Sequence, residues 1–404
     1  MELGLASATA DREIYYDPYD VVIDSDPYPV WKRMRDEAPL YYNDAHGFYA
    51  LSRWDDVDEA IADHDTYISG QGSVLEIIKA GRGVPPGMVL GEDPPIHDLH
   101  RALISRVFTP RRMAALEPQV RQLVADTLDQ FVGTDGFDFV VDLGAFIPMR
   151  VIGMMLGIPE SDQAAIRDAG HERHHLEAGQ APKASDPEIS MQAFAEYIDW
   201  RTNNPSDDLM TALLTVEFTD ETGTRRRLSR TEVLIYTALL AGAGNETTRR
   251  LIGWTGQLLG DHPDQRRQVA ADRDGLVARA VEETLRFEAP SPVQARVLSR
   301  DVELYGQTVP AGSALLLLNA SANRDERHWP DADSFDLHRA PERHLSFGHG
   351  IHFCMGAGLA RTEGRVVLDE MLKRWTDWEV DYDNAVLDHT STTRGWMKLP
   401  IRLS

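Results

Sequence analysis

The sequence predicts a mainly helical protein of the α+β class, with one long central helix and small β-sheets. Three observations support this fold class. The helical period dominates residues 97–214 and 229–259, short runs with strand periodicity lie toward both ends, and Pro and Gly are spread over all 404 residues. Because no repeat or low-complexity linker divides the chain, we expect residues 1–404 to form a single large domain, although this length usually accommodates two or three.

The N-terminal part mixes helices and strands, after a segment 1–15 that we expect to be flexible. Periodicity predicts helices at Pro27–Glu37 and Asp55–Asp65, and strands at Leu40–Tyr42 and Phe48–Leu51 around a turn at Asn43–Gly47. Residues 71–93 are rich in Gly and Pro and are expected to form a long loop. Loops of that length in compact proteins are usually functional.

The clearest predicted element is a helix that begins after Ser229. Ser229 and Glu232 form a capping box, and Leu228 and Val233 are placed for a hydrophobic staple. The helical pattern continues for about 31 residues, or roughly 46 Å at 1.5 Å per residue. Residues 233–244 are apolar on nearly all sides, so we expect this helix to be buried in a large protein.

Further helices and strands are predicted on both sides of this helix. Helices are expected at Arg111–Val132, Phe146–Leu156, Leu276–Phe287 and Ala357–Trp375, a polar hairpin at Val216–Leu228, and strands within Val302–Leu318, Trp378–Val380 and Met397–Leu403. The order of strands, many helices and then strands is typical of the α+β class.

The composition excludes several classes of protein. A net charge of -24 argues against nucleic acid or an anionic membrane as the main partner. The longest apolar stretches, Leu234–Gly244 and Ala314–Ala322, are shorter than the roughly 18 residues that a membrane span needs. A single cysteine forms neither an internal disulfide nor a multi-thiolate zinc site, and fits a reducing compartment. With no secretory signal at the N-terminus, we expect a soluble cytoplasmic protein.

The single cysteine, Cys354, lies in a glycine-rich stretch, residues 347–356, directly before a predicted helix. Glycines permit a tight loop that approaches a flat ligand closely, and the N–H groups at the helix start favour a thiolate. A thiolate held in this way suits a haem iron. Two alternatives stay open on the residues alone: a small buried hydrophobic residue, or a nucleophile beside His349 or His352.

The pattern Phe347-Gly-x-Gly-x-His-x-Cys354-x-Gly356 resembles the haem-binding signature of cytochrome P450, with every fixed position filled. The resemblance implies a single cytochrome P450-type fold of the soluble bacterial kind, haem b (iron protoporphyrin IX) as cofactor and Cys354 as the metal ligand. It also implies that Phe347, Gly348, His352 and Gly356 contact the cofactor.

The middle of the long helix, Ala243–Thr248, carries a second set of candidates. Small side chains at Ala243 and Gly244 would let a macrocycle or bound oxygen lie against the backbone. Glu246 and Thr247 offer an acid and an alcohol that can relay protons. They are similar to the acid–threonine pair of the family, with Glu in place of the more usual Asp.

The same resemblance assigns supporting residues. Glu283, Arg286 and Arg339 match a buried structural network behind the cysteine loop. The haem propionates would be bound by His97, Arg101, Arg296 and His344.

The resemblance also predicts the substrate and the electron donor. The pocket would be walled by residues 71–90, 169–177, 239–243, 292–295 and 392–396, whose side chains are mostly apolar. We therefore expect a hydrophobic substrate, such as a terpenoid, steroid or fatty-acid-like molecule, that is hydroxylated with O2. No dinucleotide or iron–sulfur motif is present, so electrons would come from a ferredoxin and its reductase. A basic docking patch would comprise Arg106, Arg111, Arg112, Arg343, Arg361 and Arg365.

Three rival functions remain at this point. A peroxide-using member of the same fold usually lacks the acid–threonine pair, which is present here. A haem-binding sensor without turnover is disfavoured by the same pair. A cysteine hydrolase would be a colourless protein.

Overall fold

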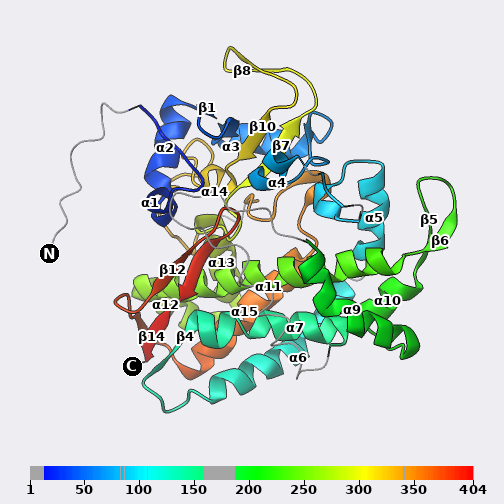
Figure 1. Cartoon of the computed structure of the whole chain (residues 1–404). Helices are drawn as coiled ribbons and strands as arrows, with labels where there is room; N and C mark the ends of the chain where they lie inside the picture. The colour runs from blue at the N-terminus through cyan, green and yellow to red at the C-terminus, as the bar shows by residue number, and fades with distance from the viewer. Residues whose placement is uncertain are drawn as a thin grey trace.

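The computed structural model describes residues 13–81, 83–85, 87–106, 108–158, 187–339 and 343–403. Of the N-terminal segment expected to be flexible, residues 1–12 lie outside the described residues, and so does the predicted pocket wall 169–177. Sheets and short helices of the N-terminal part occupy one side of the molecule, and the long helices occupy the other (Figure 1).

The long central helix is α11, Arg230–Asp261. Its capping box is confirmed, since Glu232 N donates to Ser229 Oγ at 3.2 Å and Ser229 N donates to Glu232 Oε2 at 2.7 Å. Several other helices pack against it, as expected for a helix whose residues 233–244 are apolar on nearly all sides.

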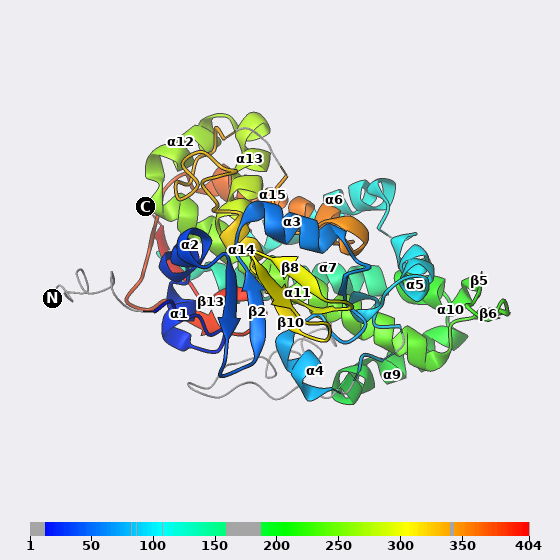
Figure 2. The same cartoon turned by 90° about the horizontal axis from the view of Figure 1, so that it is seen from above.

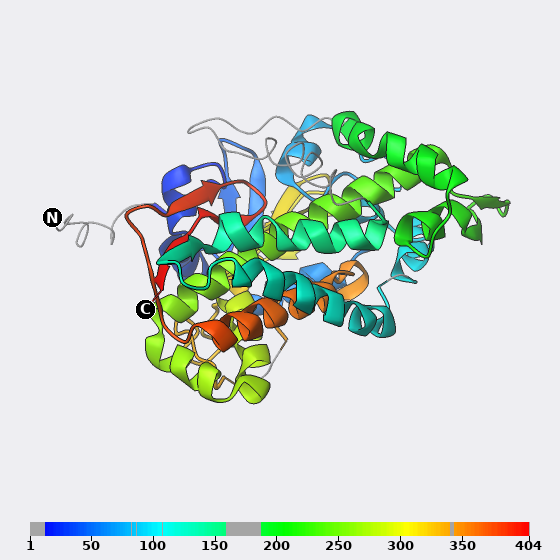
Figure 3. The same ribbon diagram turned by 90° about the horizontal axis from the view of Figure 1, so that it is seen from below.

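Helices pack around α11 on several sides, and Figure 3 shows α6, α7 and α15 across one of them. The helices before α11 are α1 Val21–Ser25, α2 Tyr28–Glu37, α3 Trp54–Ala62, α4 Leu75–Ala80, α5 Ile96–Ser105, α6 Pro110–Asp129, a π-helical turn Phe139–Gly144, α7 Ile147–Leu156, α9 Pro187–Asn203 and α10 Leu209–Thr215. Those after it are α12 Pro263–Ala271, α13 Arg273–Phe287, α14 Asn319–Ala322 and α15 Ala357–Arg374.

The largest sheet has five strands in the order β1-β2-β10-β7-β3, where β10 is parallel to β2 and antiparallel to β7. These strands are β1 Leu40–Asn43, β2 Phe48–Leu51, β3 Tyr67–Ile68, β7 Gln294–Leu298 and β10 Ala314–Leu317. Side chains alternate along β10: Leu315 and Leu317 belong to the same buried cluster as residues of α3, while Ala314 and Leu316 pack on the other face. Figure 2 shows α3 next to the strands of this sheet. The sheet therefore has a buried layer on both sides.

The remaining sheets are small. They pair β11 Trp378–Val380 with β14 Pro400–Leu403 and β4 Gly136–Asp138, β12 Val386–His389 with β13 Arg394–Lys398, β5 Glu217–Thr219 with β6 Arg225–Arg227, and β8 Val302–Leu304 with β9 Gln307–Val309. The hairpin β12–β13 lies against α11.

The structure corrects several sequence expectations. Residues 71–93 are not a continuous loop, because they contain α4 and a short 3-10 turn at Val89–Gly91. Helix α12 was missed because its side chains are largely polar, and β7 was missed because a short apolar run does not distinguish strand from helix.

One stretch of the described residues, Phe139–Leu156, is long and apolar enough to cross a membrane, and 67% of it is buried inside the protein. It comprises the π-helical turn and α7, which both pack on α11.

Candidate functional site

The cysteine loop connects a turn after Leu345 to the start of α15. Cys354 N donates to Phe347 O at 2.9 Å, which closes the loop. Gly348 and Gly350 have φ values of +68° and +66°, a conformation that side chains with a Cβ rarely adopt. A Cβ at Gly350 would also lie 3.3 Å from Ile61 O. The glycine pattern is therefore required by the backbone of this loop.

The thiol of Cys354 is accessible to solvent, but protein atoms surround it closely enough to limit its hydration. Its side chain is exposed, yet burial raises the pKa of the thiol, while the N–H groups of Gly356 and Ala357 and the charge of Arg101 oppose that rise. The Cys354 thiol can therefore be reached by solvent although the surrounding protein atoms limit its hydration. The thiolate expected from the helix start is thus not favoured by the protein alone, and a bound cation would be needed to stabilise it.

The middle of α11 has an exposed face, although most residues of the helix are buried or half-buried. Gly242 and Ala243 are exposed, and a Cβ at Gly242 would meet no atom of the described residues within 4 Å. Gly244 differs from expectation, because a Cβ there would lie 2.8 Å from Ile152 Cδ1 of α7. Gly244 serves the close approach of two helices, and Gly242 provides the open position.

The acid and the alcohol on this helix both have protein partners. Thr247 Oγ1 donates to Ala243 O at 2.8 Å. Glu246 Oε1 lies 2.5 Å from Arg250 Nη2, and Glu246 Oε2 lies 3.7 Å from Arg249 Nη1. Neither arginine was predicted as a partner of Glu246 from the sequence, although the i+3 and i+4 spacing was the signal that could have indicated the contact.

Four basic side chains gather beside the cysteine loop. The rings of His97 and His352 lie 4.4 Å apart between centroids, and Nε2 of each is buried without a hydrogen-bond partner. Burial, together with the neighbouring charges of Arg296, His97 and Arg101, lowers the pKa of His352 to about 3. The structure therefore brings together four residues that the sequence assigned to the cofactor.

The two arginines of this group lack an anion. Arg101 donates to Phe353 O, and Arg296 donates to Ala295 O at 2.8 Å and to Gln294 Oε1 at 3.1 Å. Burial lowers the pKa of Arg296 to about 10. Within the described ranges, no carboxylate lies at ion-pair distance from either guanidinium, and an unpaired buried cation is costly. The two negatively charged propionates of a haem would compensate the positive charges of these two guanidinium groups.

His344 forms its hydrogen bonds with a different set of residues. Its Nε2 is 3.3 Å from Glu282 Oε2, and its Nδ1 accepts from Ser346 N at 3.3 Å. Glu282 also accepts from Arg361 at 2.7 Å and 2.9 Å. Both ring nitrogens of His344 are therefore engaged by protein groups, which anchors the segment that leads into the loop, and its assignment to a propionate stays a prediction.

The network expected behind the loop is confirmed. Arg286 donates twice to Glu283, at 2.7 Å and 2.8 Å, and Arg339 Nε lies 3.4 Å from Glu283 Oε1. Arg286 Nη1 also donates to Asn323 O at 2.9 Å. The Asn323 side chain then accepts from Leu345 N at 2.7 Å and donates to Ser346 Oγ at 2.8 Å. This network therefore reaches the segment that leads into the cysteine loop.

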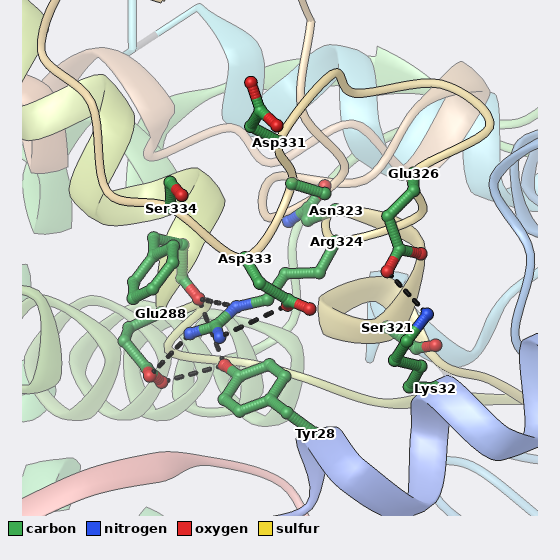
Figure 4. A network of polar contacts seen from close by, with 12 residues as sticks. Tyr28, Lys32, Glu288, Ser321, Asn323, Arg324, Glu326, Asp331, Asp333 and Ser334 are labelled. Carbon is green, nitrogen blue, oxygen red and sulfur yellow. Dashed lines mark hydrogen bonds and ion pairs between the residues drawn. The ribbon is translucent and has the colours of Figure 1, made fainter.

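The neighbouring Arg324 ties a second set of elements together (Figure 4). It donates to Glu288 Oε1 at 2.9 Å, and Glu288 Oε2 accepts from Tyr28 Oη at 2.8 Å. The end of α13 is thereby joined to α2, which lies more than 250 residues earlier in the sequence.

A family model of cytochrome P450 matches residues 186–403. A putative cytochrome P450 123 from Mycobacterium tuberculosis (strain H37Rv) is 40% identical over 397 residues, which cover 97% of both chains. The chain belongs to the cytochrome P450 family. It is a monooxygenase of the oxidoreductase class, and its cofactor is haem b, as the sequence predicts.

Solved structures of other P450s share this fold. Cytochrome P450 CYP109Q5 from Chondromyces apiculatus has a TM-score of 0.84 and 33% identity, with 96% of this chain and 98% of that chain covered. P450BioI, solved with an acyl carrier protein that bears hexadec-9Z-enoic acid, has a TM-score of 0.82 and 26% identity, with coverage of 95% and 100%. The predicted fold class is confirmed by these structures.

Proposed function

We propose that this P450 hydroxylates a small-to-medium hydrophobic molecule, of the terpenoid, steroid or fatty-acid-like classes, with O2 and electrons from a ferredoxin and its reductase. Cys354 is the iron ligand, and His97, Arg101, Arg296 and His352 hold the propionates. The observation that carries the proposal is the buried guanidinium of Arg296 together with the half-buried guanidinium of Arg101, neither of which has a carboxylate partner among the described residues. A cytoplasmic location is part of the proposal and is supported by the single cysteine.

Haem b, when bound, supplies the iron at which dioxygen is bound and reduced. The chain's own task is to deliver protons and to exclude bulk water. The Thr247 hydroxyl is held by the Ala243 carbonyl, and the Glu246 side chain is 25% exposed, so it can exchange protons with water and pass them to Thr247. Ala243 and Gly242 leave the space in which a small ligand can approach the helix.

A hydrophobic substrate is supported by the apolar residues of the predicted pocket walls, several of which line one small hollow with a cavity volume of about 10 Å³. Val74, Leu75, Val293 and Ala295 provide apolar lining, together with the more polar Ser73, Glu76, Gln294, Ser391 and Thr392 and with Pro18, Tyr19 and Leu316. Trp396 does not share this position, since its indole packs against Trp254 and donates to Gln257 Oε1 at 2.8 Å.

The function is tested by turnover. Molecules of the three classes are screened for a shift of the resting haem spectrum, and those that bind are incubated with ferredoxin, its reductase and ¹⁸O-labelled dioxygen. We expect one labelled oxygen atom in the product. Binding without any oxygenated product would favour the sensor, and oxygenation with hydrogen peroxide alone would favour the peroxide-using enzyme.

A basic surface beside the cysteine loop supports the proposal that the electron donor is acidic. Arg106, Arg111, Arg112 and Arg365 have no carboxylate partner in the described part of the chain, and Phe353 nearby is 40% exposed. Two other arginines of the predicted patch are already neutralised: Arg343 lies 2.5 Å from Asp58, and Arg361 lies 2.7 Å from Glu282.

Charge reversal tests this surface. In Arg111→Glu/Arg112→Glu, the second-order rate of reduction by ferredoxin is expected to fall at least tenfold at low salt, because electrostatic steering raises association rates by about 10- to 1000-fold. Stopped-flow reduction over a series of salt concentrations measures it. Arg343→Glu is the matched control, with a smaller expected effect since Asp58 already neutralises that side chain. An unchanged rate and salt dependence in the double variant would rule out this docking site.

A further inference from the structure

A chain of buried charges joins the acid of α11 to the hairpin β12–β13. Glu246 contacts Arg250 at 2.5 Å, and the same guanidinium of Arg250 contacts the carboxylate of Asp388 on β12. The side chains of Arg250 and Asp388 are 0% and 2% exposed. A single buried guanidinium is thus shared between two carboxylates that are 142 positions apart in the sequence (388 minus 246).

The hairpin holds this guanidinium in place. Arg250 Nη1 donates to Gly395 O at 3.2 Å and to Trp396 O at 2.9 Å, and a Cβ at Gly395 would lie 2.5 Å from Arg250 Cδ. The neighbouring Arg249 donates to Met397 O at 3.3 Å. Both arginines are therefore fixed by backbone carbonyls of β13.

Glu246 is the most accessible member of this set. Its side chain is 25% exposed, whereas the side chain of Arg249 is 6% exposed and those of Arg250 and Asp388 are still more buried. A carboxylate that carries protons must leave its partner and return to it. The strength of its attachment to Arg250 consequently matters for proton delivery.

We propose that Asp388 is a positioning residue that acts through Arg250 and keeps Glu246 free to exchange protons. The inference rests on the proposed function, in which Glu246 and Thr247 deliver protons. While Asp388 balances the charge of Arg250, the buried guanidinium does not depend on Glu246 for neutralisation. Without the charge of Asp388, Arg250 has Glu246 as its close anionic partner, and the attachment of Glu246 tightens because an uncompensated buried charge is costly.

The experiment uses the haem-loaded enzyme with its electron donors and a substrate from the screen. In Asp388→Asn we expect product formation to fall about tenfold, which is less than the roughly 10²- to 10⁴-fold that a positioned acid contributes, because Glu246 itself is still present. We also expect a larger solvent deuterium isotope effect and a larger share of electrons lost as hydrogen peroxide, with an unchanged spectral binding constant for the substrate. A purely structural role for Asp388 would not raise the isotope effect.

The matched control is Asp377→Asn. Asp377 lies 2.7 Å from Arg266, which is 4% exposed and also donates to the backbone carbonyls of Thr376 and Trp378. This variant removes a carboxylate from another buried arginine, away from α11 residue 246. We expect its isotope effect and peroxide fraction to match those of the wild-type enzyme.

Combining Asp388→Asn with Glu246→Gln decides whether the residue acts through the acid. The double variant should show the isotope effect of Glu246→Gln alone, and multiplied effects would overturn the inference, as would an Asp388→Asn enzyme that behaves like the control. Denaturant unfolding of the same proteins gives a readout without turnover, in which we expect non-additive midpoints; additive midpoints would also overturn it. If Glu246→Gln alone turns over like the wild type, the proton role in the proposed function fails, and the inference fails with it.

Discussion

Replacing Cys354 with Ala is expected to abolish the strongly red-shifted band that a thiolate-ligated haem gives when it is reduced and treated with carbon monoxide. The chain has a single cysteine, so no other thiolate can replace it. The anionic sulfur pushes electron density into the iron, and that donation causes the red shift. The difference spectrum of the purified wild-type and variant proteins measures the effect, and we expect hydroxylation by the variant to fall below detection.

His349→Ala is the control for this substitution. His349 Nδ1 lies 3.0 Å from Asp58 Oδ1 at the protein surface, and the structure shows no hydrogen bond from it to Cys354 among the described residues. The variant should therefore keep the band. A colourless wild-type protein, or a hydrolytic activity that needs both Cys354 and His349, would instead favour the cysteine hydrolase.

Features encoded by neighbouring residues were predicted correctly from the sequence. The capping box Ser229–Glu232 and the pair Glu283–Arg286 each lie within one helical turn, so their spacing alone determines that the side chains meet. The tight backbone of the cysteine loop could also be predicted from its glycines, because only a few residue types tolerate these backbone angles.

Some features that depend on distant segments could not be predicted from the sequence. The sequence predicts a contact with the cofactor for both His344 and His352. In the folded chain, His352 lies against His97 and His344 lies against Glu282. The contact between Arg250 and Asp388 joins a helix to a hairpin that follows it by more than a hundred residues. No periodicity in the sequence reports such a contact.

Replacing Arg286 with Met is expected to lower the free energy of unfolding by about 3–5 kcal/mol, which is typical when one partner of a buried ion pair is removed. The side chains of Arg286 and Glu283 are 2% and 5% exposed, so the remaining carboxylate would be buried without its bidentate partner. The backbone carbonyls of Asn323, Ala332 and Ser334 would each lose a donor as well. Denaturant unfolding of the haem-loaded and haem-free proteins measures the loss.

The control for Arg286 is Arg273→Met on the same helix. Arg273 pairs with Asp369 at 3.1 Å, but its side chain is 39% exposed, so the expected loss is below about 1 kcal/mol. The two variants also differ in what they do to the cofactor. Arg286 supports Asn323, which orders Leu345 and Ser346 ahead of the cysteine loop, whereas Arg273 has no such connection. Arg286→Met should therefore bind less haem per chain even at temperatures where it remains folded, and an equal haem content in both variants would show that the network stabilises the fold without ordering the loop.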